Sequence, residues 1–375
     1  MLLTALAALC IHAAVVAVKS LAHPDHTLLA MLRVGELPAG HVPAFVREEQ
    51  FPLEKGGTGT DGQQYLFVAH DPFVARGDML FAIDAPRYRY GRILLPLLAD
   101  ATCAARSPCI PYAMIGWNLL FAAAIGAWAA WLVRARGLHP GWGLLLACTG
   151  ALICATDITT TELAAQCFGL LGVVLVERRR LGAAAVAFAL AALARETYVL
   201  LPFGFALAVL VDARERRWRD AFTLALAALP AVGWALYLRV RHVPEGAGGG
   251  ARLNFAPPFW GLLSHVVAFA RAPHFSGGTA ITLLVAVPLL IAIGRHFAAL
   301  RRDRGGLAIA GACFAIVGVF ASAQVWVSPG GFARGLDFLY PSLLLCALVR
   351  RDRFAWVLAG STVLHAVNLV ADHLA

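Results

Sequence analysis

The sequence predicts an all-α protein, a polytopic bundle of about 11 transmembrane helices with a large first loop outside the membrane. The composition is the first reason: 60% of the 375 residues are hydrophobic and only 14% are charged. The mean hydropathy of +0.73 is far above that of a water-soluble domain. Apolar runs of about 15 to 25 residues recur along the chain, as in helical membrane proteins. We therefore expect residues 1–375 to form a single transmembrane domain.

The first elements are an apolar helix and the large loop. Residues 1–22 lack the basic start and the A-x-A end of a cleaved secretory signal, so we expect a retained helix. Residues 23–110 are predicted to form the first extracytoplasmic loop. Inside it, "RILLPLLADATCA" (residues 92–104) is too short to span a bilayer and contains Asp100 and a proline. We expect this stretch to be an interfacial or re-entrant helix.

The later apolar runs predict the other spans. Runs 181–194 and 198–211 are short and meet at "ARETY", which suggests half-length or strongly tilted helices. Residues 241–277 are predicted to form a second extracytoplasmic loop with a surface-lying helix near 259–272. The other expected spans lie at about 111–133, 141–157, 162–176, 221–240, 278–294, 306–327, 336–349 and 354–373.

The basic residues predict the orientation. They form short clusters between apolar runs, and an even number of crossings separates successive clusters, so all of them can lie in the cytoplasm. The clusters begin at Arg134, Arg178, Arg214, Arg295 and Arg350. This arrangement predicts a multi-pass protein of the inner (plasma) membrane. It also accounts for the net charge of +9 without nucleic acid as a partner, because aromatic residues do not interleave with the clusters.

The cysteines give no metal-type spacing such as CxxC. Six of the eight lie inside apolar runs and are interpreted as small core residues. Cys103 and Cys109 flank a polar turn, and they would pair if that turn faces an oxidising compartment.

The stretch "TGTDGQQYLFVAHDPF" (residues 58–73) is unusually polar for this chain. Asp61 and Gly62 are also typical of an ordinary turn. Arg87, Arg89 and Arg92 follow among tyrosines, in a pattern that suits either a lipid phosphate or a plain interfacial anchor.

Three further sites carry ionisable residues next to apolar runs. Arg195 and Glu196 would line a polar cavity or form a structural ion pair. Arg334 is the basic residue of a short outer connection, where it would bind a phosphate or snorkel to the interface. Asp157 and Glu162 begin and end "DITTTE", where they would border the same cavity or belong to a helix cap, and the pattern favours the cap.

Three of these stretches resemble one family. "DGQQYLFVAHDPF", "PRYRYGRILLPLLA" and "ALARETYVLLPFGFAL" look like bacterial integral-membrane glycosyltransferases of the GT-C class, which share their broad architecture with the mannosyltransferases of GPI-anchor assembly. The similar words are confined to residues 61–98 and 194–204, with a weaker patch at 332–341.

The resemblance implies transfer of a hexose, such as mannose, from a polyprenyl-phosphate donor to a lipid, glycan or protein acceptor on the outer face. Asp61 would be the general base and Asp71 a second catalytic acid. The residues implied in binding the substrate or lipid phosphate are Tyr65, Arg89, Arg92, Arg195, Glu196 and Arg334. No cofactor is expected, and the loop has no clear DxD metal motif. The alternatives are a transporter or flippase for a lipid-linked saccharide and a non-catalytic membrane subunit.

Overall fold

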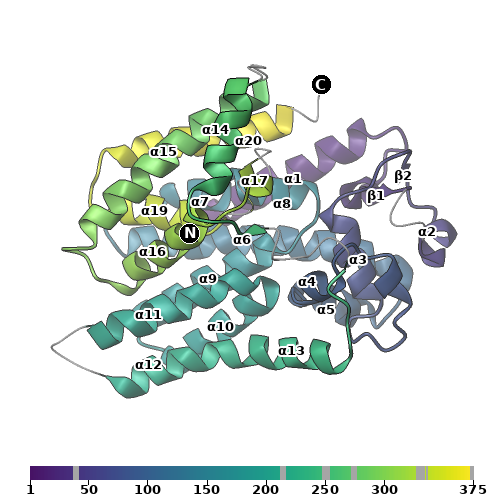
Figure 1. The fold of residues 1–375 in the computed structure, drawn as a ribbon, viewed down its shortest axis with the longest axis horizontal. Coiled ribbons are helices and arrows are strands. Elements are labelled where there is room, and N and C mark those ends of the chain that lie inside the picture. The colour runs from purple at the N-terminus through teal and green to yellow at the C-terminus, as the bar shows by residue number, and fades with distance from the viewer. Residues whose placement is uncertain are drawn as a thin grey trace.

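The computed structural model describes residues 1–36, 42–211, 217–246, 254–271, 277–326, 334 and 337–371. In these ranges the fold is all-α (Figure 1), as predicted. The two described strands, β1 (Val34–Gly35) and β2 (Leu53–Glu54), are short and pair in parallel inside the first loop.

Among the described residues, three helices are long and apolar enough to cross a membrane: Leu2–Ala22, Ser107–Arg134 and Trp218–Val240. Most of the other predicted spans are shorter or divided. The bundle helices are α1 (Leu2–Ala22), α6 (Ile110–Arg134), α7 (Trp142–Ala147), α8 (Gly150–Asp157), α9 (Glu162–Glu177), α10 (Leu181–Ala194), α11 (Leu200–Val211), α12 (Trp218–Ala225), α13 (Leu229–Val240), α14 (Trp260–Arg271), α15 (Gly277–Ala299), α16 (Gly306–Val319), α17 (Ala323–Trp326), α19 (Leu339–Val349) and α20 (Phe354–Ala371).

Small residues let these helices approach closely. Gly126 of α6 faces α1, where an added Cβ would lie 2.9 Å from the carbonyl oxygen of Thr4. Gly172 of α9 lies under the Phe188 ring of α10, with 2.3 Å between the same hypothetical Cβ and the ring. Close packing of this kind stabilises helix pairs whose surroundings are apolar.

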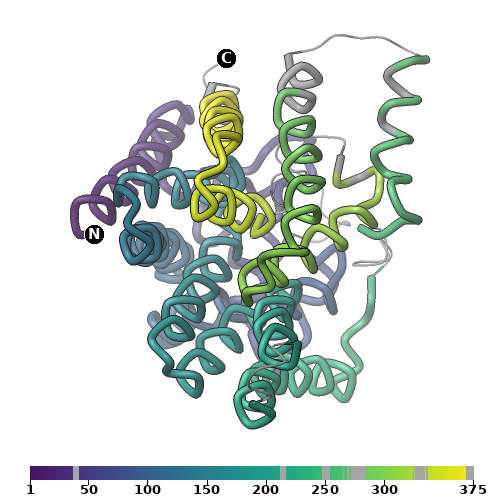
Figure 2. The backbone as a smooth tube through the Cα atoms, turned by 90° about the vertical axis from the view of Figure 1, so that its left-hand side faces the viewer, coloured from purple at the N-terminus to yellow at the C-terminus, as the bar shows by residue number. Residues whose placement is uncertain are grey.

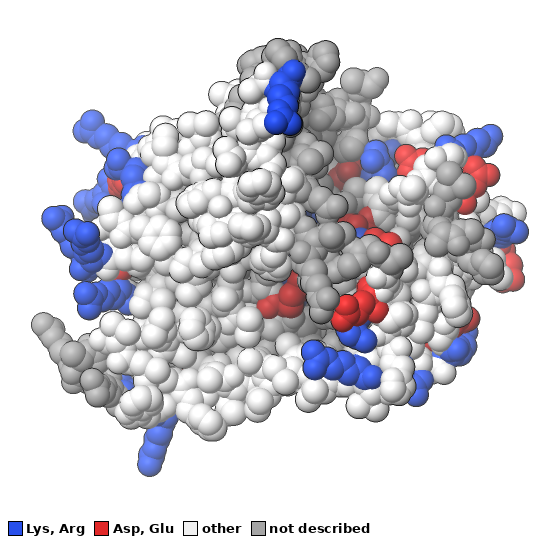
Figure 3. All heavy atoms as spheres, in the orientation of Figure 1, with Lys and Arg blue, Asp and Glu red and all other residues white. Residues whose placement is uncertain are grey.

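One end of the bundle is basic. Lys and Arg side chains gather at the left-hand end in Figure 3, and Figure 2 views the backbone from that side. Two ion pairs join the predicted clusters there: Arg136 to Glu177 at 2.6 Å, and Arg295 to Asp352 at 2.8 Å. The ion pairs therefore join basic clusters two by two, and Arg214 and Arg216 of a further predicted cluster lie outside the described residues.

The segment before α14 is fixed to the bundle by backbone hydrogen bonds. The amides of Ala256 and Phe259 donate to the carbonyls of Phe320 and Val319, both at 2.8 Å. The predicted helix near 259–272 is confirmed as α14, which runs across the direction of α9, α11 and α15 in Figure 1. Its exposed face includes Trp260.

The first loop folds into a compact layer at the opposite end of the bundle (Figure 1). Residues 61–70, which include the Asp-Gly pair, form a helix that is buried along most of its length. The helical elements of the layer are η1 (Leu28–Leu32), α2 (Ala44–Glu48), α3 (Asp61–His70), η2 (Asp78–Phe81), α4 (Pro86–Tyr90), α5 (Leu94–Cys103) and η3 (Ser107–Cys109).

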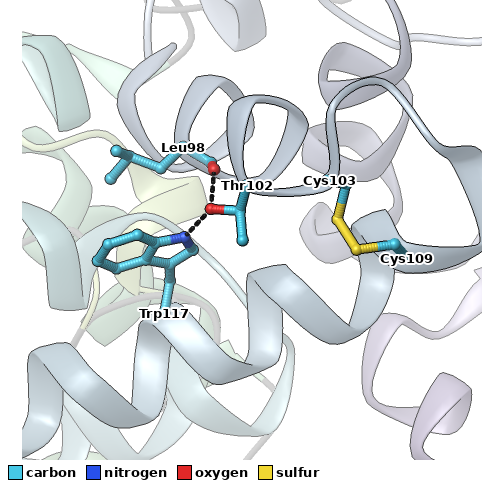
Figure 4. Close-up of a disulfide and its surroundings, with 5 residues drawn as sticks. All are labelled: Leu98, Thr102, Cys103, Cys109 and Trp117. Carbon is cyan, nitrogen blue, oxygen red and sulfur yellow. Dashed lines mark hydrogen bonds between the residues drawn. A yellow bond between two sulfur atoms is a disulfide. The ribbon is translucent and has the colours of Figure 1, made fainter.

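The predicted interfacial stretch forms α5, which packs against α6. A disulfide between Cys103 and Cys109 closes the turn that joins the two helices (Figure 4). Beside it, Trp117 of α6 donates a hydrogen bond of 2.9 Å to the Thr102 hydroxyl, which in turn donates to the Leu98 carbonyl at 2.7 Å. The turn, the end of α5 and the first part of α6 are thus held together.

The disulfide can be tested by counting thiols. We expect the denatured protein to gain two reactive thiols on reduction, and a Cys103→Ala/Cys109→Ala variant to gain none. The double variant should lose about 2 kcal/mol of stability, since the bond closes a short loop. An equal thiol count before and after reduction would contradict the pairing.

His70 at the end of α3 is enclosed by the loop layer. Its ring stacks on Phe45 at 3.7 Å between centroids, Nδ1 lies 2.8 Å from the Leu66 carbonyl, and Nε2 lies 2.8 Å from the Ser107 hydroxyl. Burial lowers the pKa of His70 to about 4, although the Leu66 carbonyl acts in the opposite direction. His70 is therefore neutral at pH 7.

This burial predicts acid sensitivity of the loop layer. Below pH 6.5 the unfolded chain binds a proton at this position while the folded layer does not, so stability falls from pH 6.5 towards 4. The loss approaches about 3 kcal/mol, since one pKa unit corresponds to about 1.4 kcal/mol. Thermal unfolding in detergent at pH 7 and 4.5 measures it. We expect His70→Gln to remove part of the pH dependence, and an unchanged dependence would contradict the assignment.

Candidate functional site

Asp61 joins the loop layer to the bundle through two arginines. As the first residue of α3, it places its carboxylate beside the positive end of the helix. Its Oδ1 lies 2.8 Å from Nη2 of Arg89, which belongs to α4. Its Oδ2 lies 2.7 Å from Nη2 of Arg334, which is 273 residues away in the sequence. Each carboxylate oxygen thus has its own guanidinium partner.

The ion pairs continue from Arg334 into the bundle. Nε of Arg334 donates to Oε1 of Glu162 at 2.9 Å, and the same oxygen accepts from Nη1 of Arg195 at 2.7 Å. Nε of Arg195 lies 3.8 Å from Oδ1 of Asp337. The Tyr198 hydroxyl is 3.0 Å from the other oxygen of Asp337. Residues from α3, α9, the α10–α11 junction and the approach to α19 therefore form one network.

Arg92 forms a second cluster beside the first. Its Nε and Nη2 bind the two oxygens of Glu196 at 2.9 and 2.7 Å. Nη1 donates to the Tyr65 hydroxyl at 3.2 Å, and Nη2 donates to the Tyr88 hydroxyl. The Arg89 guanidinium lies 5.8 Å from the Tyr65 ring and 5.5 Å from the Tyr88 ring, which links the two clusters.

The structure brings together seven of the eight predicted site residues. They are Asp61, Tyr65, Arg89, Arg92, Arg195, Glu196 and Arg334. The sequence therefore named residues that lie together in the fold, although it gave no direct indication of which arginine pairs with which carboxylate.

Asp71 is the exception and requires a correction. It follows the last residue of α3, roughly 15 Å along the helix axis from Asp61. Its carboxylate accepts hydrogen bonds from the backbone amides of Ala75, Arg76 and Gly77 at 2.8, 3.0 and 2.9 Å. Asp71 shapes a turn, because a carboxylate satisfied by three amides has little capacity left for a substrate.

Asp84 is the second acidic residue beside Asp61, and the sequence analysis missed it. Its oxygens accept from Nε and Nη2 of Arg89 at 2.9 and 2.7 Å, so Arg89 bridges Asp61 and Asp84. Its sequence signal was its place directly before "APRYRY", the arginine-rich segment. Acidic side chains are visible over this part of the molecule in Figure 3.

Glu162 and Asp157 also differ from the helix cap that was predicted for them. Asp157 ends α8 and pairs with Lys19 of α1 at 3.0 Å. The side chain of Glu162 is fully buried at the centre of the network, and its Oε2 has no hydrogen-bond partner among the described residues. The sequence does not show this role, because the burial of Glu162 and its pairing with Arg195 and Arg334 depend on the tertiary structure.

The charges fix the protonation of Asp61. Burial alone would raise the pKa of its carboxyl group, but the positive charges of Arg334 and Arg89 outweigh this effect. They hold the pKa of Asp61 well below its ordinary value. Asp61 is therefore a carboxylate at neutral pH, and in this paired state it is a weak base.

Gly62 explains how α3 comes so close to the bundle. A Cβ at this position would lie 2.1 Å from the carbonyl oxygen of Ile158, in the turn before α9. The Asp-Gly pair thus begins a helix and does not form an ordinary turn. The absence of a side chain at Gly62 permits the close backbone contact.

A separate cavity of about 330 Å³ lies where α1 meets the loop layer. Ionisable residues in its lining include Lys19, His23, Arg33 and Glu54. The carbonyl of Arg33 accepts a hydrogen bond of 3.1 Å from the amide of Thr60, the residue before Asp61. The lining of this cavity does not include the arginines that hold Asp61.

Within the described part of the chain, no three or more His, Cys, Asp and Glu side chains are placed to hold a metal ion. No known protein-family model matches this sequence, and no curated protein is detectably similar to it. The functional argument therefore depends on the site itself.

The role of Gly62 can be tested by adding one methyl group. We expect Gly62→Ala to destabilise the protein by about 1 to 3 kcal/mol, because the backbone carbonyl of Ile158 must move. Gly116→Ala is the matched control, since a Cβ on Gly116 of α6 meets nothing within 4 Å. Thermal unfolding of both variants measures the difference. Equal stabilities would contradict the close contact.

Proposed function

We propose that this protein is an integral-membrane glycosyltransferase of the GT-C class. It would move a hexose from a polyprenyl-phosphate donor to a lipid, glycan or protein acceptor on the outer face of the inner membrane. The observation that carries this proposal is the meeting of Asp61, Arg89 and Arg334 at the junction of loop layer and bundle. Such a transfer needs a base for the acceptor hydroxyl and positive charge beside the leaving phosphate, and a carboxylate beside arginines can supply both.

The surface of the protein supports insertion in a membrane. Large apolar side chains are exposed on several bundle helices, including Leu236 and Val240 of α13 and Trp356 and Val367 of α20. Extensive apolar surface of this kind needs lipid or a partner to cover it. The basic end would face the cytoplasm. The opposite end carries the disulfide, which fits an oxidising extracytoplasmic compartment.

The proposed reaction assigns separate roles to the carboxylate and the arginines. Asp61 would take the proton of the acceptor hydroxyl while that oxygen forms a bond to the anomeric carbon. The bond from this carbon to the phosphate oxygen breaks at the same time, and its electron pair stays on the phosphate. The anomeric centre is inverted. Water then removes the proton from Asp61.

The arginines would stabilise the leaving phosphate. Arg89 and Arg334 present planar guanidinium groups, which match phosphate oxygens in geometry and charge. Preorganised donors aimed at developing negative charge lower the barrier by roughly 2 to 4 kcal/mol each. Arg92 and Arg195 are each already paired with a carboxylate, Glu196 and Glu162, and would stabilise the structure of the site.

Asp61→Asn tests the proposed role of this carboxylate. We expect roughly a 10²- to 10⁴-fold loss of turnover, because a general base contributes about that factor. Release of polyprenyl phosphate from a panel of polyprenyl-phosphate hexoses, followed by mass spectrometry in vesicles, measures it. Asp78→Asn is the matched control, an exposed loop aspartate paired with Arg76 at 3.8 Å. A transporter or a non-catalytic subunit would show no such turnover in the parent protein.

A further inference from the structure

We infer that Asp61 is a built-in competitor for phosphate: its carboxylate occupies the anion site formed by Arg89 and Arg334, and a phosphate ester bound there displaces it. This inference rests on the proposed function and deepens it. In the resting protein the base would be tied to the arginines that should hold the donor. Binding of the donor phosphate would then release the base for the reaction.

The geometry around Asp61 is that of an occupied anion site. Two guanidinium groups from distant parts of the chain converge on its two oxygens at 2.8 and 2.7 Å. Charge-assisted hydrogen bonds of this length are the ones that arginine makes to phosphate as well as to carboxylate. A phosphate group would offer the same two arginines equivalent oxygens.

Both arginines keep a second anchor when Asp61 leaves. Arg89 remains bound to Asp84 through two hydrogen bonds of 2.9 and 2.7 Å. Arg334 remains bound to Glu162 at 2.9 Å. The two guanidinium groups would therefore stay in place, so the anion site is preformed and only its occupant changes.

Of the two carboxylates that bind Arg334, Asp61 is the one that reaches the surface. Its side chain is 29% exposed, whereas that of Glu162 is 0% exposed and fixed between Arg334 and Arg195. A rotation about χ1 to another staggered rotamer would take the carboxylate several ångströms away from both arginines. Such a rotation needs no movement of α3 itself.

The exchange would also solve a chemical problem. While Asp61 is bound to both arginines it is a weak base, so the resting site cannot deprotonate an acceptor efficiently. A bound phosphate would neutralise the arginines in its place, and the released carboxylate regains its ordinary basicity. Catalytic competence would thereby depend on the presence of the donor.

The test is the affinity of Asp61→Asn for phosphate, measured with the full chain in detergent. The amide removes the competing charge, so we expect the variant to bind polyprenyl phosphate about tenfold more tightly than the parent protein. Inorganic phosphate, titrated separately, distinguishes the two sources of the group: a headgroup site binds only the lipid, and a free-phosphate site binds both. Thermal unfolding checks that the variant is folded.

Two controls complete the design. Asp352→Asn also removes a carboxylate from an arginine, Arg295, but at the basic end of the bundle, and its phosphate affinity should equal that of the parent protein. Arg334→Gln introduced into Asp61→Asn should abolish the gain. Unchanged or weaker binding by folded Asp61→Asn would overturn the inference.

The outcomes separate this inference from the proposed function. If turnover depends on Asp61 but Asp61→Asn binds phosphate with unchanged affinity, the transferase proposal is supported and the competitor inference is overturned. If Asp61→Asn binds phosphate more tightly but the parent protein releases no polyprenyl phosphate from any donor, the competitor inference is supported and the transferase proposal is overturned.

Discussion

The burial of several arginines at the junction between the loop layer and the bundle constrains the whole structure. An unpaired buried charge costs several kcal/mol, and removing one partner of a buried pair costs about 3 to 5 kcal/mol. Every guanidinium in the network therefore has a carboxylate partner. These partners come from α3, the segment before α4, α9, the α10–α11 junction and the approach to α19. The first loop and the bundle consequently depend on each other for their positions.

Partners in this network are shared. One oxygen of Glu162 accepts from both Arg195 and Arg334, and one nitrogen of Arg89 contacts both Asp61 and Asp84. Because partners are shared, Arg89 and Arg334 would each keep a carboxylate partner if another anion took the place of Asp61. The exposure of the acids falls from Asp84 and Asp61 at the surface to Glu162 in the interior. Any rearrangement would thus begin at the surface of the loop layer.

The interruption between α10 and α11 contributes charged residues to the same junction. α10 ends at Ala194 and α11 begins at Leu200, so Arg195 and Glu196 lie where the backbone has left the regular helix. Interruptions of this kind place polar groups at membrane level while protein surrounds them. Gly62 has a related effect at the opposite side of the site, because it allows α3 to approach the turn at Ile158. Both features place charged side chains close to one another.

The sequence by itself determined the helical class, the short helix α5 and the α10–α11 junction, and it named residues that lie together at the candidate site. Hydropathy and loop composition are local properties, so they can be read from neighbouring residues. About eleven spans remain a prediction, since three helices in the described part of the chain are long and apolar enough to cross a membrane. Tertiary structure alone decided that Asp84 and not Asp71 accompanies Asp61, and that Glu162 is the buried centre. Tertiary structure also showed that Gly62 permits the close contact between α3 and the carbonyl of Ile158. The reason is that charge pairing and close packing join residues as far apart as Asp61 and Arg334, and no local pattern records which distant group a side chain will meet.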